Sequence, residues 1–239
     1  MPTIVARLTE LPVGAHCLGI HVGEAEGAAQ AADFVAGAPD RQPASFWVSD
    51  ERRQQEYRET MGRVSPQQVG CVAVLPSEQV APVAGVLRPV DEISRFVAGH
   101  PEGVTAGADT IDRHWTAATI PDYLEYEEWF ESQRGDRSRF LCPYDLRRIP
   151  PEAAPELLRG LGSHHSHVVL SENPEPAVRL LELFIFGRPD ALPPALEPTL
   201  AWARARGYLG AGRAEEDLSL TPEGERLIRA WSDSTEVDW

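Results

Sequence analysis

The stretch "SRFLCPYDLRRIPPEAAPELLRGLGSHHSHVVLS" (residues 138–171) contains two short apolar runs with an amphipathic segment between them. The runs at 138–146 and 165–171 have the length of buried strands. The segment 151–162 has proline in its first turn and leucines at helical spacing. A strand, a helix and a second strand in this order predict a parallel pair joined by a right-handed crossover. The stretch therefore predicts an α/β fold.

The same alternation continues on the N-terminal and C-terminal sides. Further strands are predicted at 16–23, 44–50, 70–79 and 104–110, and further helices at 24–37, 51–63, 89–103, 120–135 and 176–187. Strands that alternate with helices of this length favour a mainly parallel sheet with helices on both faces. We expect a three-layer α/β domain over residues 1–190.

The net charge of the chain limits the classes of molecule that it can bind. The 239 residues include 37 acids and no lysine, so all 22 basic side chains are arginines and the formal net charge is −15. Such a surface repels phosphate backbones, which disfavours nucleic-acid binding by the chain itself. No apolar run has the length of a membrane span, and three cysteines are too few for a disulfide framework. A cytoplasmic protein without membrane contact is expected.

The first strand, loop and helix, "LGIHVGEAEGAAQ" (18–30), lie where nucleotide-binding proteins of this class carry a phosphate loop. That loop ends in lysine followed by serine or threonine, and the lysine holds the β- and γ-phosphates. Here the loop has Gly23 and Gly27 with acidic Glu24 and Glu26, and the chain has no lysine. The sequence therefore excludes ATP as a cofactor.

Polar residues follow several of the predicted strands. In a parallel sheet, ligands bind outside the carboxyl ends of the strands, so these residues form a candidate ligand-binding rim. The rim consists of Glu24, Asp50, Asp109, Tyr144 and Asp145. The alternative is that they are ordinary polar loop residues and helix caps.

Three segments together resemble the MEDS domain, the sensory domain of methanogen and methylotroph proteins and of the dichloromethane-responsive repressor. They are "GAHCLGIHVG" (14–23), "YLEYEEWFESQ" (123–133) and "FLCPYDLRRIP" (140–150), the last followed by histidine and a final apolar strand. The matching positions are His16, Cys17, Tyr126, Glu127, Cys142, Tyr144 and Asp145.

The resemblance covers about residues 10–190 and implies a RecA-like sheet that has lost its Walker motif and senses a small molecule or another signal. It adds Tyr126 and Glu127 to the ligand-binding residues. The chain departs from the family pattern in its triple-histidine segment "HHSH" (164–167) and in residues 76–104, which match nothing in the family.

Histidines and a cysteine gather at the opposite edge of the predicted sheet. His16 and Cys17 begin the first strand, and His164, His165 and His167 precede or begin the last one. Imidazole and thiolate together suit Zn²⁺, iron or haem, so these five residues form a candidate metal site. The alternative is that they are core residues that form hydrogen bonds, because no tight metal-binding spacing is present.

Residues 191–239 differ from the rest. They resemble the carboxyl half of a winged-helix domain, in which Thr221 caps a final helix with Pro222 at its first position. The arginines of this segment are cancelled by its acids. We therefore expect an appendage that docks a protein partner or a second copy of the chain, and not a DNA reader.

Two function classes follow. The first is a non-enzymatic sensor that binds a small molecule, a metal ion or a haem and signals to a partner through the C-terminal segment. The alternative is an enzyme that uses the rim, with Asp145 or Asp109 as base, Tyr144 as acid and Cys142 as nucleophile.

Overall fold

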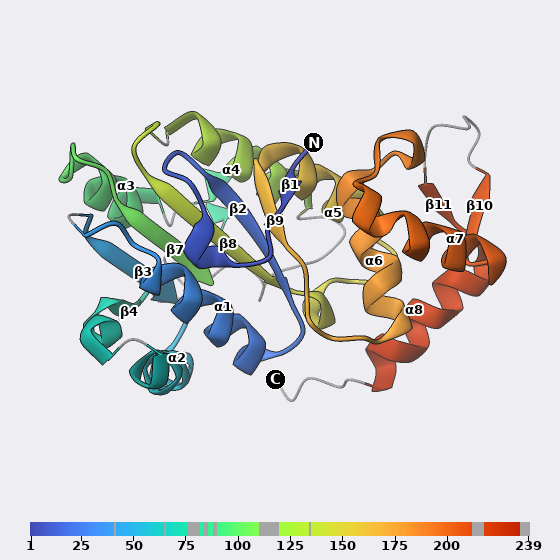
Figure 1. Ribbon diagram of the computed structural model, residues 1–239, viewed down its shortest axis with the longest axis horizontal. Coiled ribbons are helices and arrows are strands. Elements are labelled where there is room, and N and C mark those ends of the chain that lie inside the picture. The colour runs from blue at the N-terminus through green and yellow to red at the C-terminus, as the bar shows by residue number, and fades with distance from the viewer. Residues whose placement is uncertain are drawn as a thin grey trace.

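A seven-stranded parallel sheet forms the centre of the protein (Figure 1). The computed structural model describes residues 1–40, 42–64, 66–75, 82–83, 86–87, 90–109, 120–133, 135–211 and 218–234. The strand order is β1 (Thr3–Ile4), β9 (His167–Val169), β2 (His16–His21), β8 (Arg139–Asp145), β7 (Thr105–Asp109), β3 (Ala44–Val48) and β4 (Val72–Val74). Every neighbouring pair in this sheet is parallel, which confirms the predicted α/β class with a mainly parallel sheet.

Helices pack on both faces of the sheet. One face is covered by α1 (Glu24–Ala36) and α2 (Glu51–Val64). The other is covered by α3 (Val90–Ala98), α4 (Ile120–Gln133), α5 (Ala154–His164) and α6 (Pro176–Phe186). Successive side chains of a strand point to opposite faces. Leu18 of β2 therefore joins the core under α5 and α6, whereas its neighbour Cys17 joins the core under α1 and α2.

Short elements complete the main domain. A two-stranded antiparallel hairpin consists of β5 (Pro82–Val83) and β6 (Val86–Leu87). The 3₁₀ turns in the described part of the chain are η1 (Leu8–Glu10), η2 (Pro66–Cys71), η5 (Leu146–Arg148), η6 (Pro189–Ala191) and, beyond residue 190, η7 (Pro194–Leu196).

The C-terminal unit lies against α6, at the right of Figure 1. It consists of α7 (Glu197–Ala205), the antiparallel strands β10 (Leu209–Ala211) and β11 (Leu218–Leu220), and α8 (Pro222–Ser234). The Thr221 hydroxyl accepts a hydrogen bond from the Gly224 amide, so the predicted helix cap is confirmed. Apolar residues on both sides of the predicted boundary at residue 190 belong to one continuous core.

Within the described part of the chain, every helix is too short or too polar to cross a membrane.

Candidate metal centre

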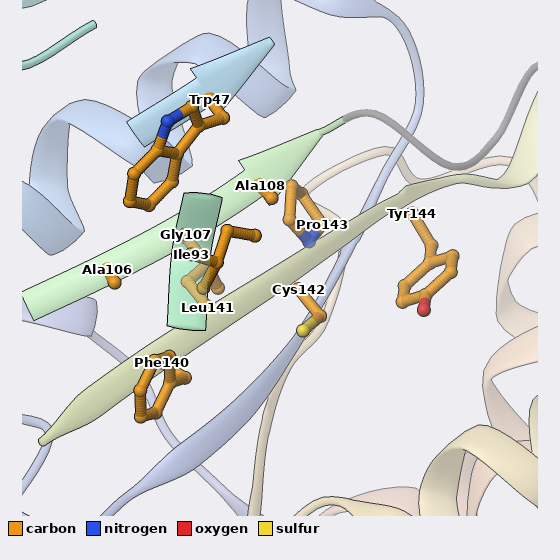
Figure 2. Close-up of a pocket in the computed structure, with 10 residues that line it drawn as sticks. All are labelled: Trp47, Ile93, Ala106, Gly107, Ala108, Phe140, Leu141, Cys142, Pro143 and Tyr144. Carbon is orange, nitrogen blue, oxygen red and sulfur yellow. The ribbon is translucent and has the colours of Figure 1, made fainter. Parts of the chain in front are cut away.

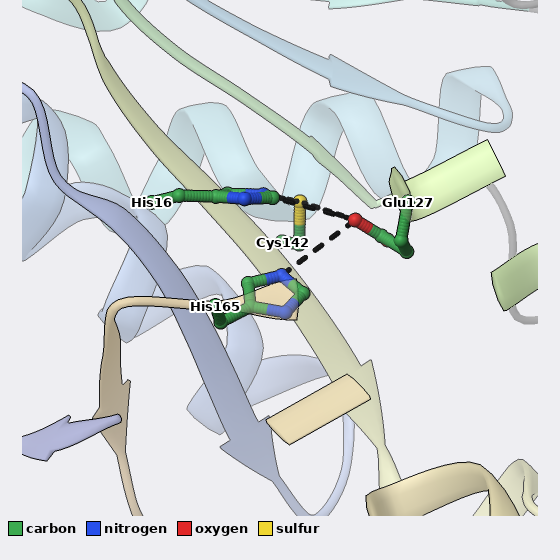
Figure 3. Close-up of side chains that lie close together, drawn as sticks. All are labelled: His16, Glu127, Cys142 and His165. Carbon is green, nitrogen blue, oxygen red and sulfur yellow. Dashed lines mark hydrogen bonds and ion pairs between the residues drawn. The ribbon is translucent and has the colours of Figure 1, made fainter. Parts of the chain in front are cut away.

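Four side chains from four separate elements meet on the face of the sheet covered by α4 and α5 (Figure 3). His16 is the first residue of β2, Cys142 lies in β8, Glu127 lies in α4, and His165 directly follows α5. Each offers one ligand atom, and these four atoms lie within 4.8 Å of one another. Nitrogen, oxygen and sulfur donors therefore surround a single point.

The individual separations are close to those of a tetrahedral metal site. His16 Nε2 lies 3.2 Å from Cys142 Sγ and 3.7 Å from Glu127 Oε2. His165 Nε2 lies 3.7 Å from the same carboxylate oxygen, and Cys142 Sγ lies 3.9 Å from it. Bond lengths typical of Zn²⁺ place neighbouring tetrahedral ligands about 3.3–3.6 Å apart. These four separations differ from that range by a few tenths of an ångström.

Three of the four candidate ligands are also held by a second interaction that orients them. His16 Nδ1 lies 2.8 Å from Glu131 Oε2, and His165 Nδ1 lies 2.7 Å from the carbonyl oxygen of Leu161. A carbonyl oxygen can only accept, so His165 Nδ1 carries the proton and the lone pair of its Nε2 is left for the centre. The hydroxyl of Tyr144 donates to Oε1 of Glu127. Outer contacts of this kind orient the ligands of metal sites.

Local structure explains why these residues meet. Cys142 and Tyr144 are two residues apart in a strand, so their side chains lie on the same face of the sheet. Glu127 and Glu131 are four residues apart in α4 and lie on one side of that helix. The Ser166 hydroxyl accepts a hydrogen bond from the His16 amide at 3.0 Å, which ties the start of β2 to the turn beside His165.

Without a cation, the centre places two acidic groups together in a buried position. Burial raises the pKa of Glu127, opposed by His16 and by the hydrogen bond from Tyr144. Burial also raises the pKa of the Cys142 thiol well above its usual value, and the neighbouring Glu127 raises it further. A buried carboxylate and thiolate are stable as charged groups when they are paired or bound to a metal. A divalent cation would neutralise both.

The structure brings only part of the predicted histidine edge together. His16 and His165 enter the centre, whereas Cys17, His164 and His167 do not. Cys17 is fully buried on the opposite face, where burial raises its thiol pKa to about 12. It could not have shared an ion with His16, because adjacent residues of a strand point to opposite faces. His164 ends α5, and Nδ1 of His167 lies 2.8 Å from the Ser166 hydroxyl.

Glu127 and Cys142 were not expected at this edge. From the sequence, Glu127 is expected among the ligand-binding residues and Cys142 in the alternative enzyme. Two local signals point toward the observed arrangement: the two-residue spacing of Cys142 and Tyr144 and the four-residue spacing of Glu127 and Glu131. The order of the strands, which sets β8 beside β2, has no local signal.

A small apolar pocket lies beside the centre (Figure 2). Cys142 and Tyr144 line it together with Trp47, Ile93 and small or apolar residues of β7 and β8. Its volume is about 20 Å³, which is the space of one water molecule. The pocket therefore has no room for a haem or a drug-sized ligand.

The predicted rim exists, but arginines occupy it. Glu24 Oε1 lies 2.5 Å from Arg52, 3.4 Å from Arg53 and 3.0 Å from Arg148. Burial acts to raise the pKa of Glu24. A hydrogen bond from Glu56 and the charges of Arg53 and Arg52 outweigh burial and lower the pKa to about 2. The loop that would hold a phosphate thus carries an internal ion-pair network.

The remaining carboxylates of the rim are also paired. Asp109 lies 2.8 Å from Arg53 and accepts a 2.5 Å hydrogen bond from the Tyr57 hydroxyl. Asp145 lies 2.7 Å from Arg147.

Asp50 and Tyr144 have other contacts than this network of arginine ion pairs. Asp50 accepts a 2.8 Å hydrogen bond from the amide of Arg53, in the first turn of α2, which is a capping role. Tyr144 points away from the rim toward Glu127. The side chain of Tyr126 lies outside the described residues.

Comparison with protein-family models, with curated proteins and with solved structures gives no match for this chain.

Proposed function

We propose that this protein is a sensory or regulatory protein whose signal is a divalent metal ion, bound by His16, Glu127, Cys142 and His165, and that it passes this signal to a partner. The single observation that carries the proposal is the convergence of these four donors, three of which are held by an outer contact. We infer no catalytic step for such a protein.

The donor set favours zinc and related ions. Two imidazoles, one thiolate and one carboxylate are borderline to soft ligands, which suit Zn²⁺ or Co²⁺, whereas Mg²⁺ and Ca²⁺ prefer oxygen alone. Four protein ligands complete a tetrahedron, which is typical of sites that hold an ion and not of sites that activate a bound water. The pocket beside Cys142 is too small for a haem. A metal ion is therefore the better candidate signal.

We further propose that the main domain is a MEDS-like sensory domain with a RecA-like sheet. In support of this, four residues that carry the sequence resemblance lie together: His16, Cys142 and Glu127 contact one another, and Tyr144 donates to Glu127. The strand order and the arginine network at the former phosphate loop fit a nucleotide-binding scaffold that has lost its ligand. Cys17 also carries the sequence resemblance, but it lies on the other face of the sheet, away from these residues.

The C-terminal unit is the proposed output, as a winged-helix-like appendage that contacts a protein partner or a second copy of the chain. Helix α5 ends next to the ligand His165, and its Arg159 donates to the carbonyl oxygen of Leu218 in β11. The same guanidinium lies 5.2 Å from the ring centroid of Phe184 in α6. Helix α5 thus contacts both the metal centre and the C-terminal unit.

The test is a zinc titration of chelator-treated protein against a chromophoric competitor, followed by cobalt substitution. We expect one ion per chain and a thiolate-to-cobalt absorption band. Cys142→Ser should remove the band, and His16→Ala and His165→Ala should weaken binding. Full-length, folded protein that binds neither zinc nor cobalt at micromolar concentration would overturn the proposal.

The geometry of Cys142 also favours a second candidate, a thiol-dependent enzyme. Its sulfur lies 3.2 Å from His16 Nε2, and His16 Nδ1 lies 2.8 Å from Glu131, which is the order of nucleophile, base and orienting carboxylate. Iodoacetamide labelling of metal-free protein separates the two candidates. If the protein is a thiol-dependent enzyme, iodoacetamide should alkylate Cys142 faster than half-buried Cys71, and His16→Ala should slow the alkylation of Cys142. A buried metal ligand should react no faster than Cys71.

A further inference from the structure

Helix α4 contributes two acidic side chains to the metal centre. Glu127 is completely buried and supplies a ligand oxygen, while Glu131, about one third exposed, contacts the outer nitrogen of His16. The two residues are separated by one helical turn and lie on the same side of the helix. One helix therefore supplies both a metal ligand and the carboxylate that orients another ligand.

The backbone of each of the other three ligands is positioned without α4. His16 and Cys142 lie on the neighbouring strands β2 and β8, which pair in register in the middle of the sheet. His165 is fixed by the carbonyl oxygen of Leu161 and by the adjacent Ser166, which bonds to the start of β2. This half of the centre is part of the sheet and of α5, and it should persist when α4 moves.

The described side chains on the inward side of α4 are two apolar residues and two acids. Ile120 is buried, and Leu124 packs on Gly160 of α5 so closely that a Cβ there would overlap it. The next inward positions are Glu127 and Glu131, a like-charge pair four residues apart, which destabilises a helix when both are ionised. A positive group between this part of α4 and the sheet would offset that repulsion.

A divalent cation at the centre would be such a positive group. It would bind the Glu127 carboxylate directly, and it would hold His16 in the orientation that meets Glu131. If α4 moved away from the sheet, the metal–carboxylate bond and the outer hydrogen bond would break at the same time. The free energy of metal binding is then also free energy of helix docking.

We propose that α4 is a metal-dependent clamp: it docks on the sheet when a zinc-like cation joins Glu127 to the other ligands, and it opens when the cation leaves. This inference rests on the proposed metal-binding function and names the element that responds to the ion. An ion that binds only the docked state at 100 times its dissociation constant lowers the opening equilibrium about 100-fold. Amide exchange in α4 should slow by up to that factor.

The experiment is hydrogen–deuterium exchange by mass spectrometry on the full-length protein, with chelator alone and with zinc buffered at about 100 times the measured dissociation constant. Peptides from 120–133 report on α4, and peptides from 24–36 report on α1, which covers the opposite face. We expect exchange in α4 to slow up to about 100-fold and exchange in α1 to change much less.

Two matched alanine variants on α4 refine the test. Glu131→Ala removes the outer contact with His16 and keeps all four ligands, whereas Glu128→Ala changes an exposed residue of the same helix. Loss of an outer contact costs about 10–100-fold in affinity, so at the same free zinc the slowing in Glu131→Ala should fall to roughly 10-fold or less. Glu128→Ala should behave as the parent protein does.

The outcomes separate the clamp from the metal site. Zinc binding with no slowing in α4, or with equal slowing in α1, would overturn the clamp and leave the metal site standing. A Glu131→Ala variant that keeps the full slowing would also overturn it. Absence of zinc binding in the parent protein would instead overturn the proposed function, and the clamp with it.

Discussion

Removal of one hydroxyl group, in Tyr144→Phe, should weaken zinc binding while leaving all four ligands in place. The Tyr144 hydroxyl donates to Oε1 of Glu127, and Oε2 of the same carboxylate faces His16 and His165. Without the hydroxyl, the carboxylate can turn away from the position that binds the metal. Loss of an outer partner typically lowers metal affinity about 10–100-fold.

The hydrogen bond itself gives an independent magnitude. Glu127 is completely buried, and a hydrogen bond to a buried charged group contributes about 1.5–3 kcal/mol. A 10–100-fold loss of affinity corresponds to about 1.4–2.7 kcal/mol. The two magnitudes are similar, so loss of this hydrogen bond is large enough to account for a loss of affinity in that range.

The chain offers a matched control in Tyr57→Phe. The Tyr57 hydroxyl donates to the buried carboxylate of Asp109 at 2.5 Å, on the rim and not at the centre. Both variants should lower the free energy of unfolding of metal-free protein by about 1–3 kcal/mol, measured in urea. Competition titration should show weaker zinc binding only for Tyr144→Phe. Equal zinc affinities in the two variants, with both folded, would refute the assignment of Tyr144 to the centre.

Three further predictions concern other parts of the fold. Cys142→Ser should abolish the thiolate-to-cobalt absorption band, and Cys17→Ser should retain it, since Cys17 lies on the opposite face. Burial raises the pKa of Glu182 from 4.5 to about 7, so the folded state binds its proton more tightly than the unfolded state does. The free energy of unfolding contributed by this group therefore falls as pH rises from about 4.5 to about 7. Between about pH 5 and about pH 8, the free energy of unfolding of the parent protein should fall by about 3 kcal/mol because of this group, and Glu182→Gln should lack this fall. Urea unfolding of both proteins at the two pH values measures the difference. Gly162→Ala should destabilise the packing of α5 on α6 by about 1–3 kcal/mol in thermal or urea unfolding, because a Cβ there would overlap the carbonyl oxygen of Ile185.

Local patterns in the sequence were sufficient for the elements and their class. Apolar runs alternating with amphipathic segments predicted six of the seven strands of the central sheet and the helices α1–α6, because burial on one face or two imposes a periodicity. The missed strand, β1, has two residues and is too short to show a period. The carboxylates at the carboxyl ends of β2, β7 and β8 could also be placed together, since all strands of a parallel sheet end at one edge.

The alternation of side chains along a strand is sufficient to exclude one of the predicted ligand pairs. His16 and Cys17 are neighbours in β2, so their side chains point to opposite faces and cannot share an ion. The spacing of Glu127 and Glu131 similarly marks one side of a helix. The predicted metal site grouped residues by strand edge, and a shared edge does not fix the face on which each side chain lies.

The composition of the candidate metal centre was decided by the tertiary structure alone. His16, Glu127, Cys142 and His165 come from four elements, and they meet because β2 lies between β8 and β9 while α4 crosses the same face. The sequence determined which side chains could bind a metal and which way each faces along its own strand or helix, because these follow from short-range periodicity. Which of them share one point depends on strand order and helix docking. These are set by the burial of many apolar side chains far apart in the chain, and no local pattern encodes them.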